Sequence, residues 1–196
     1  MKKIRLSILL LFIIMSGITY YSCSTYYRLT RFNYDYYKIA LNYISNDTSA
    51  YKFISDSYST HKRNNNLRIV VSSKVTPPQL TEFGPYIIKN RINFYLNNRY
   101  FGYKNFIIDS LISFENELKF VPYLNPNIEG LNSNNNGNAI IFFSKAYSNF
   151  LTANLFYKKK DTSISEMPSF GPSLIYLFTF KDGKIDLIMK QIISNN

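Results

Sequence analysis

The chain has 196 residues, which suits one domain behind a short leader, and its 46% hydrophobic content excludes an intrinsically disordered protein. The formal charge of +11 favours anionic partners through long-range attraction, and the 18 Tyr and 16 Phe favour β-strands. Because the chain has one Cys and one His, an internal disulfide and a zinc site built from these residue types are excluded.

The N-terminal segment is typical of an export leader. A basic start (1–5) precedes an apolar run (6–15), which is followed by small or polar residues. We therefore expect two parts: 1–27, a signal peptide or membrane anchor, and 28–196, a single extracytoplasmic α+β domain. Since three of the 23 cations belong to the leader and none of the 12 acids does, the domain keeps a charge of +8.

Cys23 is the candidate lipidation site. Its surroundings resemble those in bacterial lipoproteins, in which a diacylglycerol is attached to the Cys thiol and the leader is cut just before it. Ser22 is the small residue expected there, whereas Tyr20 and Tyr21 depart from the usual pattern. Two alternatives stay open: an uncleaved membrane anchor, because residues 6–27 carry no charge, and ordinary cleavage. Lipidation and the uncleaved anchor both predict a tethered domain in the cell envelope that faces the periplasm or the exterior.

Helices are expected in the first part of the domain. Residues 32–44, 85–96 and 107–118 carry apolar side chains at spacings of three and four, which predicts three amphipathic helices. Residues 50–57 fit a short helix or a strand equally well. Residues 67–75 are rich in β-branched side chains between turn signals, which predicts a strand.

Strands dominate the last third of the chain. After a predicted long loop at 121–138, four apolar runs follow, at 139–145, 150–157, 174–180 and 185–193. Asp182-Gly183 between the last two runs predicts a hairpin, since Gly tolerates positive φ. The third run is apolar on both faces and should be a covered central strand. The fourth run should place Ile185, Leu187, Met189 and Ile193 on one face and its charged residues on the other.

These elements predict an α+β fold, in which N-terminal helices pack on a C-terminal antiparallel meander sheet of four or more strands. The order of elements resembles the cone-shaped fold of the nuclear transport factor 2 type. The resemblance is architectural: no shared motif carries it, and the Asn-rich loop departs from it. Because such folds house both enzymes and binding modules, the resemblance implies no particular activity.

Candidate ligand-binding residues are Arg99, Tyr100, Tyr103 and Lys104. They belong to a stretch in which three rings and two cations occur within six residues, a composition suited to gripping glycans or peptides. A packed turn with buried rings is the alternative. The expected partners are the membrane, through the N-terminal anchor, and an anionic glycan, a lipid headgroup or a protein. Nucleic acid is not expected outside the cytoplasm.

No catalytic residues, metal site or cofactor are predicted. His61 lies in a basic polar turn, and the chain has no Gly-rich phosphate loop or nucleophile elbow. Asp109, Glu115 and Glu117 would do acid–base chemistry only if the tertiary fold brought them together. We therefore expect a non-catalytic, membrane-anchored binding or envelope-structural module. The alternatives are an enzyme on a scaffold of the nuclear transport factor 2 type, with Asp109 or Glu115 in its pocket, and an immunity-type inhibitor.

Overall fold

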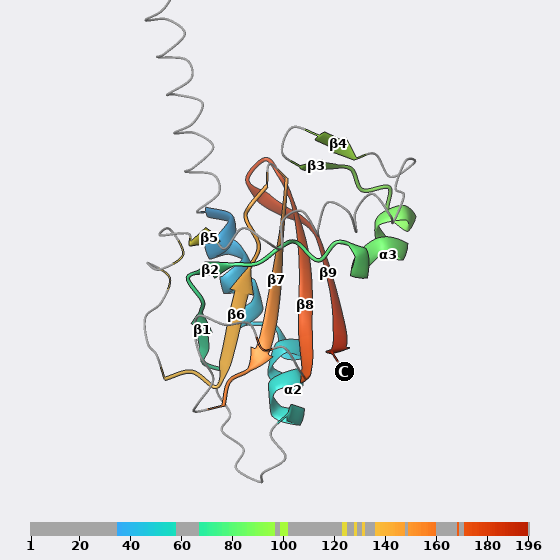
Figure 1. Ribbon diagram of the computed structural model, residues 1–196. Coiled ribbons are helices and arrows are strands. Elements are labelled where there is room, and N and C mark those ends of the chain that lie inside the picture. Colours follow the sequence, from blue (N-terminus) through green and yellow to red (C-terminus); the bar gives the residue numbers. More distant parts are fainter. Residues whose placement is uncertain are drawn as a thin grey trace, which may run out of the picture.

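The computed structural model describes residues 35–57, 67–96, 99–101, 123–124, 128, 131, 136–147, 149–159, 168 and 171–195. They form an α+β fold with N-terminal helices packed on a mainly antiparallel sheet, as predicted (Figure 1). The predicted leader with Cys23 and the predicted helix at 107–118 lie outside these residues. Within the described ranges, no helix is both long enough and apolar enough to cross a membrane.

The central sheet has five strands in the order β1-β6-β7-β8-β9. Four of them form an antiparallel meander, which confirms the predicted one: β6 (Ala139–Phe143), β7 (Phe150–Tyr157), β8 (Gly171–Lys181) and β9 (Lys184–Asn195). The hairpin between the last two strands is also confirmed, because Asp182 and Gly183 both have positive φ, at 52° and 76°. β1 (Ile69–Val71) adds to the sheet in parallel beside β6.

Two helices cover one face of the sheet, and Figure 1 shows them behind the strands. They are the helical segment 35–45, which confirms the helix expected there, and α2 (Thr48–Ser57), which decides the ambiguous stretch 50–57. The ring of Tyr36 stacks on that of Phe180, with centroids 3.8 Å apart. The buried rings of this face each contribute about 1.5–3 kcal/mol to folding.

A buried tyrosine joins the first helix to the end of β6. The hydroxyl of Tyr37 donates to the carbonyl of Ser144 at 3.1 Å and accepts from the N–H of Ala146 at 2.9 Å. The side chain is only 1% exposed, so both hydrogen bonds are shielded from water. The hydroxyl of this large core side chain therefore both donates and accepts a hydrogen bond inside the protein.

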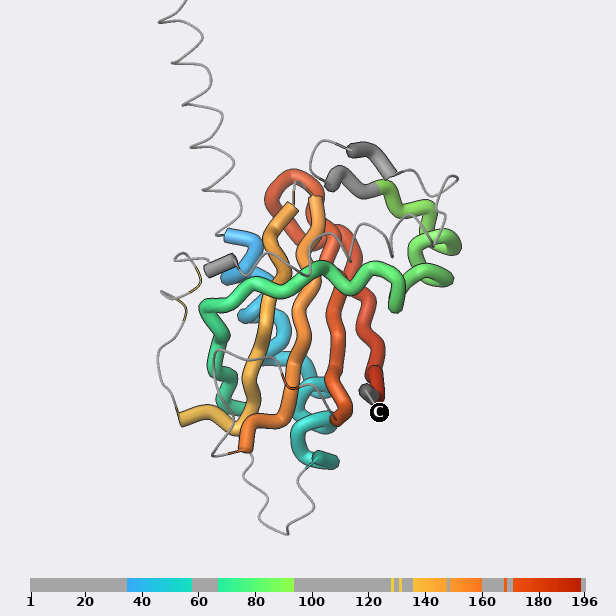
Figure 2. Tube along the Cα trace, in the orientation of Figure 1, coloured from blue at the N-terminus to red at the C-terminus, as the bar shows by residue number. Residues whose placement is uncertain are grey.

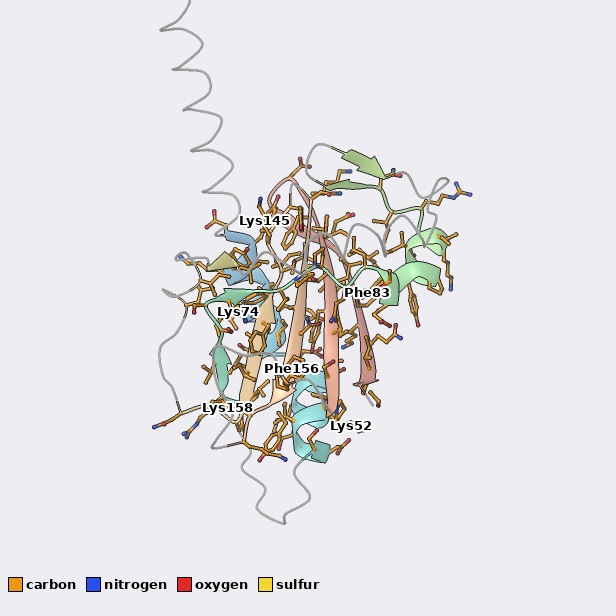
Figure 3. All side chains as sticks on the ribbon, in the orientation of Figure 1. Lys52, Lys74, Phe83, Lys145, Phe156 and Lys158 are labelled. Atoms are coloured by element: carbon orange, nitrogen blue, oxygen red, sulfur yellow. The ribbon has the colours of Figure 1, made fainter. Side chains whose placement is uncertain are left out.

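The opposite face is covered by the chain between β2 (Lys74–Val75) and α3 (Gly84–Lys89), which includes the short helix η1 (Thr81–Phe83). This segment crosses in front of the strands in Figure 2, and Phe83 is labelled on it in Figure 3. Leu80, Phe83 and Ile87 are fully buried there against β8 and β9. Because both faces are covered, β8 is buried from Ser173 to Phe180, as predicted for a central strand.

Two predictions of element length were wrong. The expected strand at 67–75 is interrupted after Val71, where the hydroxyl of Ser72 accepts a hydrogen bond from the N–H of Lys74 at 3.2 Å. β1 therefore pairs with β6, whereas β2 pairs with β5 (Tyr123–Leu124), which lies inside the predicted loop. The helix expected over 85–96 ends at Lys89, and the chain continues as β3 (Phe94–Leu96), paired with β4 (Arg99–Phe101).

β9 contains a β-bulge that the alternation of its side chains did not predict. Phe180 pairs with Ile185, but Thr179 pairs with Leu187, so Asp186 is an extra residue in β9. The extra residue reverses the alternation: Ile185 packs with the helix-covered cluster and Leu187 packs with the opposite one. The prediction that these two residues share a face was therefore wrong.

Candidate functional site

A cavity of about 540 Å³ lies where the chain leaving α3 meets the end of the β8–β9 hairpin. Three parts of the chain form its wall: residues 90–93 after α3, Asn149 before β7, and residues 179–181 with 186–187 from the hairpin. This volume is within the range of about 300–1,000 Å³ that is typical of small-molecule sites. The cavity is therefore large enough for a small ligand.

The first wall is shaped by the way α3 ends. The N–H of Ile92 donates to the carbonyl of Ile87 at 3.1 Å, and the N–H of Arg91 donates to that of Ile88 at 3.2 Å. These are the two hydrogen bonds of a Schellman cap, whose left-handed position is usually Gly. Here Arg91 occupies it with φ 53°, although this conformation costs a residue with a Cβ about 1–2 kcal/mol.

The second wall is shaped by the β-bulge. Asp186 and Leu187 are consecutive residues, and both line the cavity. Asp186 is the extra residue of the bulge, so the bulge itself forms part of the wall. Its place there agrees with the frequent occurrence of bulges beside functional sites.

Two polar atoms in the wall are buried without a hydrogen-bond partner. The side-chain amide of Asn149 donates to the carbonyl of Asn93 at 2.9 Å, which leaves its Oδ1 atom unpartnered. Thr179 is 4% exposed, and its Oγ1 atom is unpartnered as well. An unsatisfied buried polar group costs about 1–3 kcal/mol. Each of the two atoms has less than 1 Å² of accessible surface, so a ligand in the cavity would reach it only after the wall moves.

The charged residues of the wall in the described part of the chain are Arg91, Lys181 and Asp186, all exposed. Within the described part of the chain, none of the three takes part in an ion pair. Their summed charge is +1, and an apolar patch of Ile92 and Leu187 lies among them. The arrangement can bind a polar ligand that carries a negative charge.

A second polar cluster, around Asp47, is fully paired. Its carboxylate accepts from the hydroxyl of Tyr176 at 2.9 Å, from Lys190 Nζ at 3.0 Å and from the N–H of Ser49 at 3.0 Å. Burial alone would raise the pKa of Asp47, but these hydrogen bonds and the charge of Lys190 lower it overall. Burial, and then the Asp47 carboxylate, strongly raise the pKa of Tyr176. The cluster is a clamp that holds the start of α2 to β8 and β9.

The predicted site residues are placed only in part. Arg99 and Tyr100 lie in β4, where they pair with Leu96 and Tyr95, but their side chains are outside the described part of the structure. Cys23, His61, Tyr103, Lys104, Asp109, Glu115 and Glu117 lie wholly outside it. That the four candidate ligand residues lie together therefore stays a prediction. Along the chain, β3 and β4 directly follow the cavity wall at 90–93.

Among the described residues, we find no candidate site for metal binding or for acid–base catalysis. No group of three or more His, Cys, Asp and Glu side chains gathers there. Asp47 is the one described carboxylate that is not exposed, and its pKa is lowered, whereas an enclosed general acid would have a raised pKa. The enzyme alternative named Asp109 and Glu115, which lie outside these residues, so that alternative stays a prediction.

Sequence reasoning missed the residues of the cavity. Thr179 gave a faint signal, since it is the one polar residue in the apolar run 174–180. Arg91 gave none, because only the observed end of α3 shows that it occupies the left-handed position of a cap.

No protein-family model, curated protein or solved structure matches the chain. The assignment of the candidate site is therefore supported by its geometry alone.

Proposed function

We propose that this protein is a membrane-tethered, extracytoplasmic binding module that holds a small polar ligand in the cavity beside the β8–β9 hairpin. The observation that carries the proposal is the pair of buried, unpartnered atoms in the wall, Asn149 Oδ1 and Thr179 Oγ1. Nearly all buried polar groups in proteins have a hydrogen-bond partner in the protein or in ordered water. Two exceptions in the wall of one cavity of ligand size are explained if the wall opens on binding and a ligand supplies their partners.

The donor and acceptor pattern favours a ligand with hydroxyl groups. Asn149 Oδ1 can only accept, so the ligand must donate to it, while the hydroxyl of Thr179 can either donate or accept. Among the described residues, those that line the cavity include one carboxylate and neither His nor Cys. This set supports binding rather than catalysis.

The tether is proposed from the N-terminal sequence. Residues 6–27 carry no charge and follow a basic start, and Cys23 lies at their end. A lipid attached at Cys23 would anchor the chain, because each buried methylene contributes about 0.8 kcal/mol and stable anchoring takes more than one acyl chain. The domain would then meet envelope glycans and headgroups at the membrane surface.

The tether is tested by labelling with radioactive palmitate in cells that express the wild-type chain or Cys23→Ala. We expect label in the wild type, no label in the variant, and the wild-type protein in the membrane fraction. Label that persists in Cys23→Ala would contradict attachment at that thiol. A full-length chain found in the cytosolic fraction would contradict the tether itself.

The cavity is tested by methyl NMR of the full-length chain in a detergent without a sugar headgroup. Monosaccharides are titrated while the methyl signals of Leu187 and Thr179, in the wall, are followed. We expect these signals to move, whereas the methyls of Leu151 and Ile141, in the helix-covered core, stay in place. Shifts that are equal in both sets, or confined to the core, would argue against binding in the cavity.

A further inference from the structure

We infer that the ligand of the cavity is an acidic saccharide, with its carboxylate or phosphate bound by Arg91 and its hydroxyl groups bound by Asn149, Thr179 and Asp186. The inference rests on the proposed function of the cavity and goes further by naming the chemistry of the ligand. It begins from the two positive charges in the wall, Arg91 and Lys181.

Arg91 occupies a position where Gly would be more stable. The Schellman cap of α3 needs a left-handed residue there, which Gly supplies at no steric cost. Arg91 is an exposed residue of the cavity wall, and no described residue forms an ion pair with its guanidinium. Since a guanidinium binds a carboxylate or phosphate through two parallel hydrogen bonds, an anionic ligand group is its natural partner.

The other residues of the wall suit the sugar part of such a ligand. Asp186 and Asn149 Oδ1 are acceptors, and hydroxyl groups of a saccharide can donate to both. Ile92 and Leu187 provide an apolar surface for the C–H face of the ring. A bare inorganic anion would leave these acceptors unused, and a neutral sugar would leave Arg91 unpaired.

The test is a calorimetric titration of the full-length chain, in the same type of detergent, with glucuronate, glucose and inorganic phosphate. We expect glucuronate to bind at least tenfold more tightly than glucose or phosphate. Vesicles that display a glucuronate-headed lipid distinguish the source of the sugar. If the protein binds both free glucuronate and the vesicles, the ligand is a free or terminal acidic sugar. If it binds the vesicles alone, the ligand is a lipid headgroup. Equal affinity for glucose and glucuronate would overturn the inference.

Arg91→Gly is the decisive variant, because it should not harm the fold. We expect its melting temperature to equal or exceed that of the wild type, and its affinity for glucuronate to fall about tenfold or more. The matched control is Asp182→Gly. It relieves the other left-handed non-Gly position among the described residues, at φ 52°, but Asp182 is not one of the residues that line the cavity, so the affinity should stay unchanged.

The variants also separate the two proposals. If Arg91→Gly binds glucuronate as tightly as the wild type while Thr179→Val abolishes binding, the proposed binding in the cavity stands. The inference that Arg91 binds an acidic group of the ligand is then wrong. If neither variant changes the affinity, the ligand binds elsewhere and both proposals fail.

Discussion

Phe178 and Thr179 are neighbours on β8, yet they face two regions of the molecule that are built differently. Phe178 points into the helix-covered core, where the hydroxyls of Tyr37 and Tyr176 have hydrogen-bond partners. Thr179 lies in the wall of the cavity, where it and Asn149 each have a buried side-chain atom without a hydrogen-bond partner. The helix-covered face is therefore optimised for stability, whereas the cavity end retains polar groups that destabilise the fold.

The largest expected effect is on the helix-covered face. Phe178→Ala removes a fully buried ring that packs against Tyr43, Tyr176 and Phe180. We expect the free energy of unfolding to fall by about 3–5 kcal/mol, because a cavity replaces the ring. Chemical denaturation followed by circular dichroism measures the change. A loss below about 1 kcal/mol would show that this face is not the stable one.

The clamp at Asp47 gives the next largest effect. Asp47→Ala removes the acceptor for Tyr176, Lys190 and the N–H of Ser49, and leaves the Tyr176 hydroxyl buried. We expect a loss of about 2–4 kcal/mol, from the helix cap and the unpaired groups together. The control is Asp56→Ala, an exposed acid in the same helix, which should change stability by less than about 0.5 kcal/mol. Equal effects of the two variants would contradict the clamp.

The same clamp predicts how stability depends on pH. Since the pKa of Asp47 is lowered in the folded state, its contribution is complete above about pH 4 and is lost as the pH falls through the folded value. The raised pKa of Tyr176 acts at the other end: above about pH 10 the unfolded chain loses this proton first, so stability falls.

Thermal melts between pH 2 and pH 11 would check both limbs. The stability gap between the wild type and Asp47→Asn should narrow on acidification, and the alkaline loss should be smaller in Tyr176→Phe. A gap that stays constant over the acid range would contradict the assignment of the acid limb to Asp47.

The smallest expected effect has the opposite sign. Thr179→Val keeps the shape of the side chain but removes an unpartnered hydroxyl, so we expect the ligand-free protein to gain about 1 kcal/mol of stability. Denaturation without added ligand measures it. A loss of 1 kcal/mol or more would show that the hydroxyl is satisfied inside the protein.

The sequence predicted the meander because its signals are local. Alternation and apolar runs mark β6 to β9, and Asp182-Gly183 marks the hairpin by its tolerance of positive φ. The parallel pairing of β1 with β6 could not be predicted in this way, because it joins residues about 70 positions apart. Local patterns do not encode such pairings.

The cavity was beyond sequence reasoning for the same cause. It depends on the extra residue Asp186 in β9, which is set by the pairing of β9 with β8, and on the left-handed Arg91 after α3, whose residue type does not mark the end of a helix. The aromatic and cationic stretch from Arg99 to Lys104 drew attention to a nearby part of the chain instead. The residues that could bind a ligand are ordinary by type and special only by position.

Binding of the ligand at the cavity wall is tested most directly by a comparison of Thr179→Val with Thr152→Val. Both threonines are buried on β strands with an unpartnered Oγ1 atom, but only Thr179 lines the cavity. Both variants should be more stable than the wild type in the absence of ligand. We expect Thr179→Val alone to lose affinity for glucuronate, by about tenfold. An equal loss in both variants, or none in either, would contradict this expectation.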